Sequence, residues 1–98
     1  MKPQTTMTEG FKLIHDIFRL RWIPEIISTI GEGYHGYNEI LSQIDFLSNT
    51  ELNRKLKVLL ERNVIDKKES EGYYLNEFGE DLHHIFKHFS DMSDKYLT

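Results

Sequence analysis

The feature that most restricts the possible folds is a strongly marked helix start at Ser48. The run from Ser48 to Glu51 fits a capping box, in which the Ser48 hydroxyl accepts a hydrogen bond from the first turn and the Glu51 carboxylate reaches back. Leu47, directly before the cap, is expected to pack on Leu52 as a hydrophobic staple. Leucines follow at helical spacing, and Asn63 tolerates the left-handed conformation that ends helices. The sequence therefore predicts a capped helix that ends near Asn63.

An earlier segment is amphipathic on two sides. Between residues 8 and 21 the apolar residues form two sets that point in nearly opposite directions at about 100° per residue. These sets are Phe11, Ile14 and Phe18, and Leu13, Ile17 and Leu20. A surface helix of a monomer hides one stripe, so the second must be covered either by this chain or by another. Residues 1–8 are expected to be a disordered arm.

Two shorter helices and a hairpin complete the middle of the chain. A helix beginning near Trp22 is predicted by Pro24 in its first turn and by the glycines that follow it. A two-turn helix is predicted over residues 37–44. Strand-like runs at 64–68 and 73–75 predict a β-hairpin with a compact turn.

The last part of the chain carries a heptad seam. Its apolar residues recur at spacings of 4, 3, 4, 3 and 4, at Phe78, Leu82, Ile85, Phe89, Met92 and Tyr96. We expect one helix over residues 77–97, with a seam about 28 Å long at about 1.5 Å per residue. Such a helix would extend beyond its own core and offer part of the seam to a partner.

The order of these elements predicts a winged helix-turn-helix, mainly α with a small β-hairpin, as a single domain over residues 1–98. Segments 37–44 and 48–62 would be the two motif helices. A short first helix, a tight turn and a capped second helix suit insertion into a DNA major groove. Small domains of this pattern also serve as protein adaptors. Two classes of function are therefore weighed: binding of double-stranded DNA, and interaction with protein.

Composition narrows these classes. The formal net charge of −4, from 12 basic and 16 acidic residues, disfavours whole-surface attraction to nucleic acid or an anionic membrane. The charge is uneven, because residues 48–68 hold six basic and three acidic residues, a local +3, and the rest of the chain carries −7. The sequence has no cysteine, which excludes thiol chemistry and suits a reducing, cytoplasmic location. No signal peptide or membrane span is expected.

The sequence resembles the HxlR-type winged-helix transcriptional regulators over about residues 10–97, without a gap from Trp22 to Ile65. The residues that carry the resemblance are Arg21, Trp22, Ile26, Ile27, Ile30, Gly33, Tyr37, Glu39, Ile40, Leu47, Ser48, Leu52, Leu56, Leu59, Glu61, Val64, Ile65, Tyr73, Leu75, Phe78 and Gly79. His35 to Tyr37 with Glu39 and Ile40 are also similar to the related PadR-type regulators. The resemblance implies a homodimeric regulator that binds DNA sequence-specifically and dimerises through its N- and C-terminal helices.

Three departures from the HxlR-type pattern affect function. Members that sense oxidants use a cysteine shortly before the tryptophan, where residues 8–10 of this chain have none, so cysteine-based sensing is excluded. The hairpin is shorter, lacks the proline pair of the family and carries Glu69 and Glu71. Asn63 replaces the usual glycine, which left-handed geometry can accept.

The exposed face of the capped helix is expected to enter the major groove, with a solvated helix face as the alternative. Arg54 can bridge O6 and N7 of guanine, and Asn49 or Asn53 can pair with N7 and N6 of adenine. Lysines and the helix start are expected to contact phosphates. The full expected set is Ser48, Asn49, Thr50, Asn53, Arg54, Lys55, Lys57, Lys67 and Lys68.

The dimer interface is expected on the first and last helices. Its residues would be Phe11, Leu13, Ile17, Leu20, Leu82, Ile85, Phe89, Met92 and Tyr96. Two symmetric recognition helices would then address half-sites about 34 Å apart on a near-palindromic operator.

No enzymatic, cofactor or metal site is predicted. The chain lacks a phosphate-binding glycine loop and a nucleophile elbow. His83, His84 and His88 have no apparent fourth ligand and are expected to be solvated. The sequence names neither the operator nor the sign of regulation, and a small-molecule effector stays open.

Overall fold

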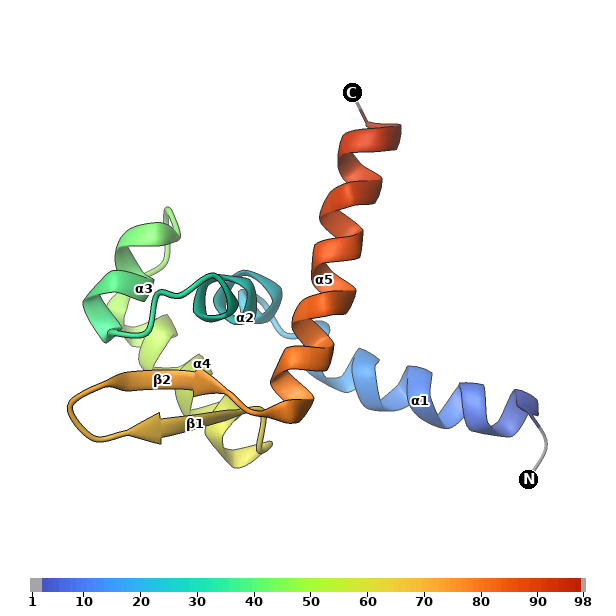
Figure 1. Ribbon diagram of the computed structural model, residues 1–98, viewed down its shortest axis with the longest axis horizontal. Helices are drawn as coiled ribbons and strands as arrows, with labels where there is room; N and C mark the ends of the chain where they lie inside the picture. Colours follow the sequence, from blue (N-terminus) through green and yellow to red (C-terminus); the bar gives the residue numbers. More distant parts are fainter. Residues whose placement is uncertain (1–2, 98) are drawn as a thin grey trace.

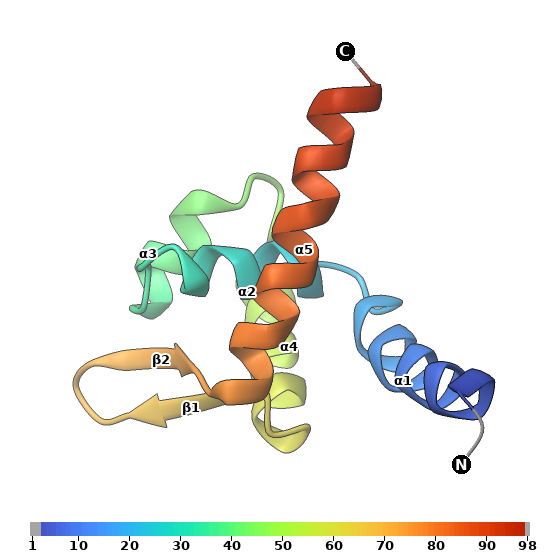
Figure 2. The same ribbon diagram turned by 45° about the vertical axis from the view of Figure 1, so that its right-hand side comes forward.

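The structure is a computed structural model that describes residues 3–97. Its elements in chain order are α1 (Pro3–Phe18), α2 (Ile23–Gly31), α3 (Tyr37–Gln43), α4 (Asn49–Glu61), β1 (Ile65–Lys68), β2 (Gly72–Leu75) and α5 (Glu77–Tyr96). The elements from α2 to β2 form the body, and α1 and the second half of α5 project from it in different directions (Figures 1 and 2). The predicted winged helix-turn-helix, mainly helical with a two-stranded hairpin, is confirmed.

The first helix begins earlier than the apolar pattern indicated. Residues 3–8, expected to be a disordered arm, form the first turns of α1, and residues 1 and 2 lie outside the described residues. The Thr8 hydroxyl donates to the Gln4 carbonyl at 2.8 Å, a helical contact between neighbouring turns. The helix ends at Phe18, and Trp22 takes a left-handed conformation, φ 72°, directly before α2.

The core centres on α2. Pro24 lies in the first turn of this helix, as predicted. The four isoleucines of α2, at most 1% exposed, are Ile23, Ile26, Ile27 and Ile30. They share one cluster with residues of α3, α4, the hairpin and α5, which include Ile40, Leu52, Leu56, Leu59, Ile65, Leu82 and Phe86. One continuous core therefore fixes the orientation of α4 against the hairpin.

Half of the predicted capping box forms at the start of α4. The Ser48 hydroxyl accepts from the Glu51 amide at 3.1 Å, as the sequence predicted. The Glu51 carboxylate does not reach back to Ser48 but pairs with Arg54 and Lys55. Both interactions run along the helix, so Glu51 pairs with side chains of α4 rather than with its cap.

The turn between α3 and α4 places two neighbouring apolar residues on opposite sides. Leu47 is 8% exposed and shares the core cluster with Leu52, in agreement with the predicted staple. Phe46 is 98% exposed and has a φ of 68°. Left-handed backbone costs a residue with a side chain about 1–2 kcal/mol, so the core must hold this turn in place.

The hairpin is fastened to the loop before α3. β1 and β2 pair antiparallel, with Lys68 opposite Gly72, and Asn63 ends α4 at φ 58°, as expected. The Tyr73 amide donates to the His35 carbonyl at 2.9 Å, and His35 Nδ1 lies 2.8 Å from the Tyr73 carbonyl. Gly72 is required here, because a Cβ would collide with the His35 carbonyl and its φ is 102°. The second strand of the hairpin is therefore tied to the loop that leads into α3.

The predicted last helix is a single element, but only part of it belongs to the core. Asn76 caps it by accepting from the Gly79 amide at 2.9 Å. Leu82 and Phe86 in its first half are 1% and 5% exposed. From Phe89 onward its apolar residues are largely exposed as the helix leaves the body (Figure 1).

Candidate nucleic-acid interface

The recognition-helix candidate α4 separates an apolar face from a polar one. Leu52, Leu56 and Leu59 are at most 2% exposed and hold the helix on the core. The opposite side is exposed and carries Thr50, Asn53, Arg54 and Lys57. These are hydrogen-bond donors and acceptors of the types that contact base edges in a major groove.

The start of α4 is held by α3. The Tyr37 hydroxyl lies 2.9 Å from Asn49 Oδ1 and 3.1 Å from the Asn49 main-chain oxygen. The adjacent Ser48 is exposed, and its hydroxyl is used in the cap. Sequence reasoning missed Tyr37, whose only signal is a hydroxyl-bearing aromatic at the first position of the preceding helix.

The positive charge of α4 is partly neutralised within the helix. Arg54 Nη1 lies 2.8 Å from Glu51 Oε1, and Lys55 Nζ lies 3.7 Å from Glu51 Oε2. The Arg54 side chain is 61% exposed, so it stays accessible from solvent. The Lys55 side chain is only 14% exposed, which does not fit its expected role as a free phosphate contact. Glu51, expected only to cap, therefore pairs with an exposed cation of this face, Arg54.

The wing places its two lysines beside aromatic rings. Lys67 Nζ lies 5.6 Å from the Tyr73 ring centre, and Lys68 Nζ lies 4.3 Å from that of Tyr74. The Tyr74 ring in turn stacks on His35 at 3.9 Å. Both lysines are exposed, and cation–π contacts orient them without removing their charge.

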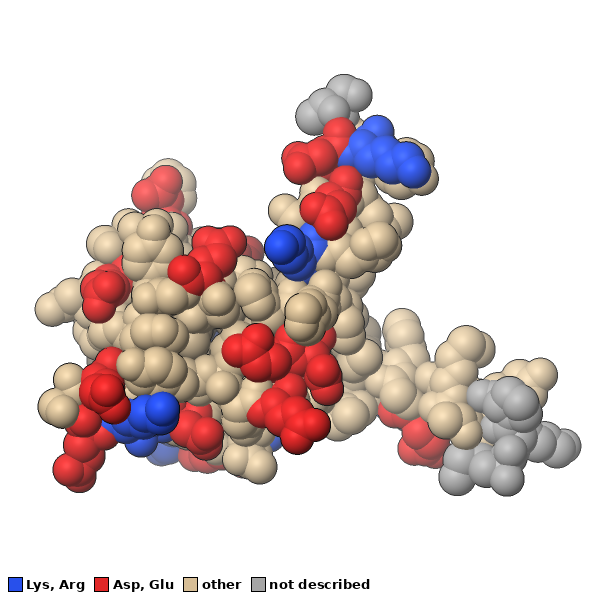
Figure 3. Space-filling view, viewed as in Figure 1, with Lys and Arg blue, Asp and Glu red and all other residues tan. Residues whose placement is uncertain are grey.

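Acidic residues dominate much of the remaining surface. On the face drawn in Figure 3, Asp and Glu spread over the body and along α5, while Lys and Arg gather near the hairpin and toward the end of α5. The local +3 of residues 48–68 thus lies beside regions of opposite sign. A polyanion is attracted most strongly through α4 and the hairpin lysines Lys67 and Lys68.

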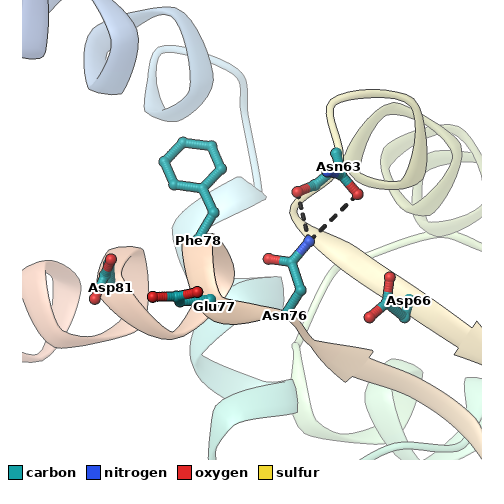
Figure 4. Close-up of a pocket in the computed structure, with 6 residues that line it drawn as sticks. All are labelled: Asn63, Asp66, Asn76, Glu77, Phe78 and Asp81. Carbon is teal, nitrogen blue, oxygen red and sulfur yellow. Dashed lines mark hydrogen bonds between the residues drawn. The ribbon is translucent and has the colours of Figure 1, made fainter.

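An open hollow of about 550 Å³ beside the wing base is acidic. Asp66, Glu77 and Asp81 line it, together with Phe78 and the hydrogen-bonded pair Asn63 and Asn76 (Figure 4). Three carboxylates in one hollow repel a phosphate group. This hollow therefore limits how closely DNA can approach the domain from that side.

The projecting helices expose apolar side chains. On α1 these include Met7, Phe11 and Leu13 at 70%, 63% and 54% exposure. On α5 they are Phe89, Met92, Tyr96 and Leu97, at 46%, 44%, 66% and 81%. Met7 and Leu97 were absent from the expected interface; Met7 continues the apolar spacing of Phe11 and Ile14 on α1, and Leu97 directly follows the end of α5. Large apolar groups on two protruding helices are typical of an interface with another chain.

Other residues of the expected dimer interface lie inside the single chain. Ile17 and Leu82 are 2% and 1% exposed and belong to its own core, so they offer no free surface to a partner. Leu20 and Ile85 are partly buried against the same core. The expected interface is therefore narrower on the body side and extends further toward the two helix ends.

The histidines of α5 are not arranged as metal ligands in the described part of the chain. Among residues 3–97 no group of three or more His, Asp or Glu side chains is arranged to hold a metal ion. His83 instead lies against the backbone of Gly31, where a Cβ would meet its ring at 2.5 Å. Within the same described residues no helix has both the length and the apolar character needed to cross a membrane.

A helix-turn-helix with a capped, exposed second helix and a hairpin that carries lysines beside its turn defines a winged-helix DNA-binding protein. Residues 17–98 match the family described as HxlR-like helix-turn-helix. The chain belongs to this family, as the sequence resemblance predicted, and is a DNA-binding transcriptional regulator.

Two solved structures of YodB from B. subtilis are similar to this chain. The quinone-bound form is 26% identical with a TM-score of 0.72, and the similarity covers 98% of this chain and 100% of that one. The diamide-treated form is 25% identical with a TM-score of 0.64, covering 98% and 95%. No curated protein matches the chain.

Proposed function

We propose that this chain is a homodimer that binds a specific, near-palindromic double-stranded DNA operator. The exposed face of α4 enters the major groove, with Arg54 and Asn53 as its base contacts. Lys57, Lys67 and Lys68 contact phosphates and position the helix. The observation that carries the proposal is the concentration of exposed cationic and amide side chains on one capped helix of an otherwise acidic chain.

Dimerisation is supported by the apolar surfaces of the two protruding helices. Phe11 and Leu13 on α1, and Phe89, Met92 and Tyr96 on α5, would be covered by the equivalent helices of a second copy. Burying apolar side chains stabilises an interface by about 25 cal/mol per Å². A two-fold dimer would present its two α4 helices to half-sites about 34 Å apart.

Specific binding is tested by selection and by salt dependence. Bound duplexes are selected from a pool with a randomised core, and affinity for the selected site and for random DNA is measured by fluorescence anisotropy. We expect a two-fold symmetric consensus and a steep loss of affinity between about 50 and 200 mM salt. No enrichment of any sequence would contradict specific recognition, and a salt-independent signal would contradict contact with phosphates.

The dimer has a separate test that needs no DNA. Sedimentation equilibrium of the full chain at micromolar concentration should give twice the monomer mass of 11.7 kDa. A stable monomer across the concentration range would contradict the homodimer. DNA binding by that monomer would leave the recognition surface of α4 in place.

A second candidate is a winged-helix module that binds protein rather than DNA. The observations that favour it are the 98% exposed Phe46 in the turn before α4 and the acidic tip of the hairpin at Glu69 and Glu71. A protein adaptor would show no retention on heparin and no salt-dependent DNA binding. Retention on heparin at low salt, released by 200 mM salt, would favour the DNA-binding candidate.

Signals that act through thiols are not available to this chain. Its 98 residues contain no cysteine. The quinone-bound and diamide-treated forms are forms of YodB. A signal received by the present chain would act through other groups.

A further inference from the structure

Tyr37 and Asn49 open the two helices of the motif and are joined by their side chains. The Tyr37 hydroxyl lies 2.9 Å from Asn49 Oδ1 and 3.1 Å from the Asn49 main-chain oxygen. The Tyr37 ring is half-buried and packs against the core, whereas Asn49 is exposed at the first position of α4. The contact therefore ties a side chain of the expected DNA face to the body of the domain.

The chemistry of this contact determines what Asn49 can offer to DNA. The two atoms that face the hydroxyl are both oxygens, which can only accept, and they share its single hydrogen. The amide nitrogen of Asn49 has no hydrogen-bond partner within residues 3–97. Its two hydrogens are thus left for an external acceptor. An unrestrained Asn would offer acceptor and donor together, which is what bidentate pairing with adenine requires.

We propose that Tyr37 is a positioning residue that sets base preference by holding Asn49 as a hydrogen-bond donor. This inference rests on the proposed DNA-binding function and deepens it. Guanine presents two acceptors in the major groove, O6 and N7, whereas adenine presents the acceptor N7 and the donor N6. With Oδ1 turned toward the Tyr37 hydroxyl and the NH2 group left unpaired, Asn49 favours the two acceptors of guanine at its base pair, in place of the adenine contact that its residue type alone predicted.

The test uses Tyr37→Phe, which removes the hydroxyl and keeps the ring on the core. Sites are first selected by the wild-type chain from duplexes with a randomised core. The wild type, Tyr37→Phe, Asn49→Ala and the double variant are then compared by competition on sites changed at one base pair. We expect Tyr37→Phe to shift the adenine-to-guanine binding ratio at one base pair of each half-site by about fivefold or more toward adenine. The shift should vanish when Asn49 is Ala.

A matched control separates this effect from a general change in packing. Tyr34 is also half-buried, lies just before α3, and makes no side-chain hydrogen bond within the described part of the chain. Tyr34→Phe removes the same group from the same region, and we expect it to leave the base preference unchanged. Thermal unfolding of each variant reports whether the fold is retained.

The outcomes distinguish this inference from the proposed function. An unchanged base preference in Tyr37→Phe, or a shift that persists with Asn49→Ala, overturns the role of Tyr37. An equal loss of affinity on every sequence would make the hydroxyl merely structural and also overturns it. If the wild-type chain selects no sequence, the proposed function fails and the inference falls with it. A wild type that selects a site, beside a Tyr37→Phe variant with the same preference, rejects the inference alone.

Discussion

Replacing Glu51 by Gln should strengthen DNA binding while weakening the fold. The Glu51 carboxylate holds Arg54 at 2.8 Å and Lys55 at 3.7 Å, on the helix that we propose to enter the major groove. For Arg54 to reach a base, this pair must open and leave an unpaired carboxylate near the phosphates. The amide of Gln keeps a similar shape without the charge, so neither cost arises.

The magnitude follows from two contributions. Exposed helix pairs at this spacing are worth about 0.3–0.5 kcal/mol, and the Arg54 side chain is 61% exposed. Repulsion between the carboxylate and a phosphate about 8 Å away is about 0.5 kcal/mol in water before screening by salt. Together they predict a two- to fivefold gain in affinity. The fold loses the same ion pair and a favourable charge in the first turn of α4, about 0.5–1.5 kcal/mol of unfolding free energy in total.

Fluorescence anisotropy with the selected site at fixed salt measures the gain, and thermal unfolding measures the loss. Glu61→Gln is the matched control, because Glu61 lies exposed at the other end of α4 and forms no ion pair within residues 3–97. This control removes an equal charge but no ion pair with Arg54, so we expect less than a twofold gain in DNA affinity. The reasoning is refuted if Glu51→Gln binds no more tightly than the wild type, or gains no more than Glu61→Gln.

Three further predictions concern the proposed contacts. Arg54→Ala should cost about 1–3 kcal/mol on the selected site and relax preference at one base pair, and an equal loss on random DNA would argue against base contact. Lys67→Ala should weaken all duplexes similarly and reduce the salt slope by about one, whereas a change in the selected consensus would show that it does more than contact phosphate. Phe89→Asp places a charge on the exposed half of α5 and should give a monomer with unchanged helix content by sedimentation and circular dichroism. A dimer that survives this change would show that the interface lies elsewhere.

Local signals were enough to predict most of the fold. Ser48 caps α4 and Asn63 ends it with positive φ because both effects involve only neighbouring backbone. The prediction that Glu51 completes the capping box is wrong for an equally local reason. Its carboxylate lies three positions from both Ser48 and Arg54, and the pattern does not rank a cap contact against an ion pair with two cations.

The spacing of residues in the sequence does not predict contacts between segments that are far apart in the chain. The hydroxyl of Tyr37 reaches Asn49 twelve positions later, because the turn brings the starts of α3 and α4 together. Similarly, the two apolar sides of α1 are visible in the sequence, but how far along the helix each side is covered depends on how α1 leaves the body. Leu13 and Ile17 belong to the same apolar set, yet Ile17 lies in the core and Leu13, one turn farther from the body, is 54% exposed.

The acidic surface of the domain favours specific over non-specific DNA binding. A basic surface binds any duplex through its phosphates, and this non-specific term competes with the operator at every other site on the genome. Here the acidic body, the hollow lined by Asp66, Glu77 and Asp81, and the pairing of Glu51 with Arg54 all reduce that term. A matching base sequence adds hydrogen bonds that can offset opening of the Glu51 pair, and random DNA does not. The cost of opening the Glu51–Arg54 pair falls only on the site where Arg54 contacts a base, whereas repulsion between the Glu51 carboxylate and phosphate acts on every duplex, so the Glu51→Gln gain should be larger on the selected site than on random DNA.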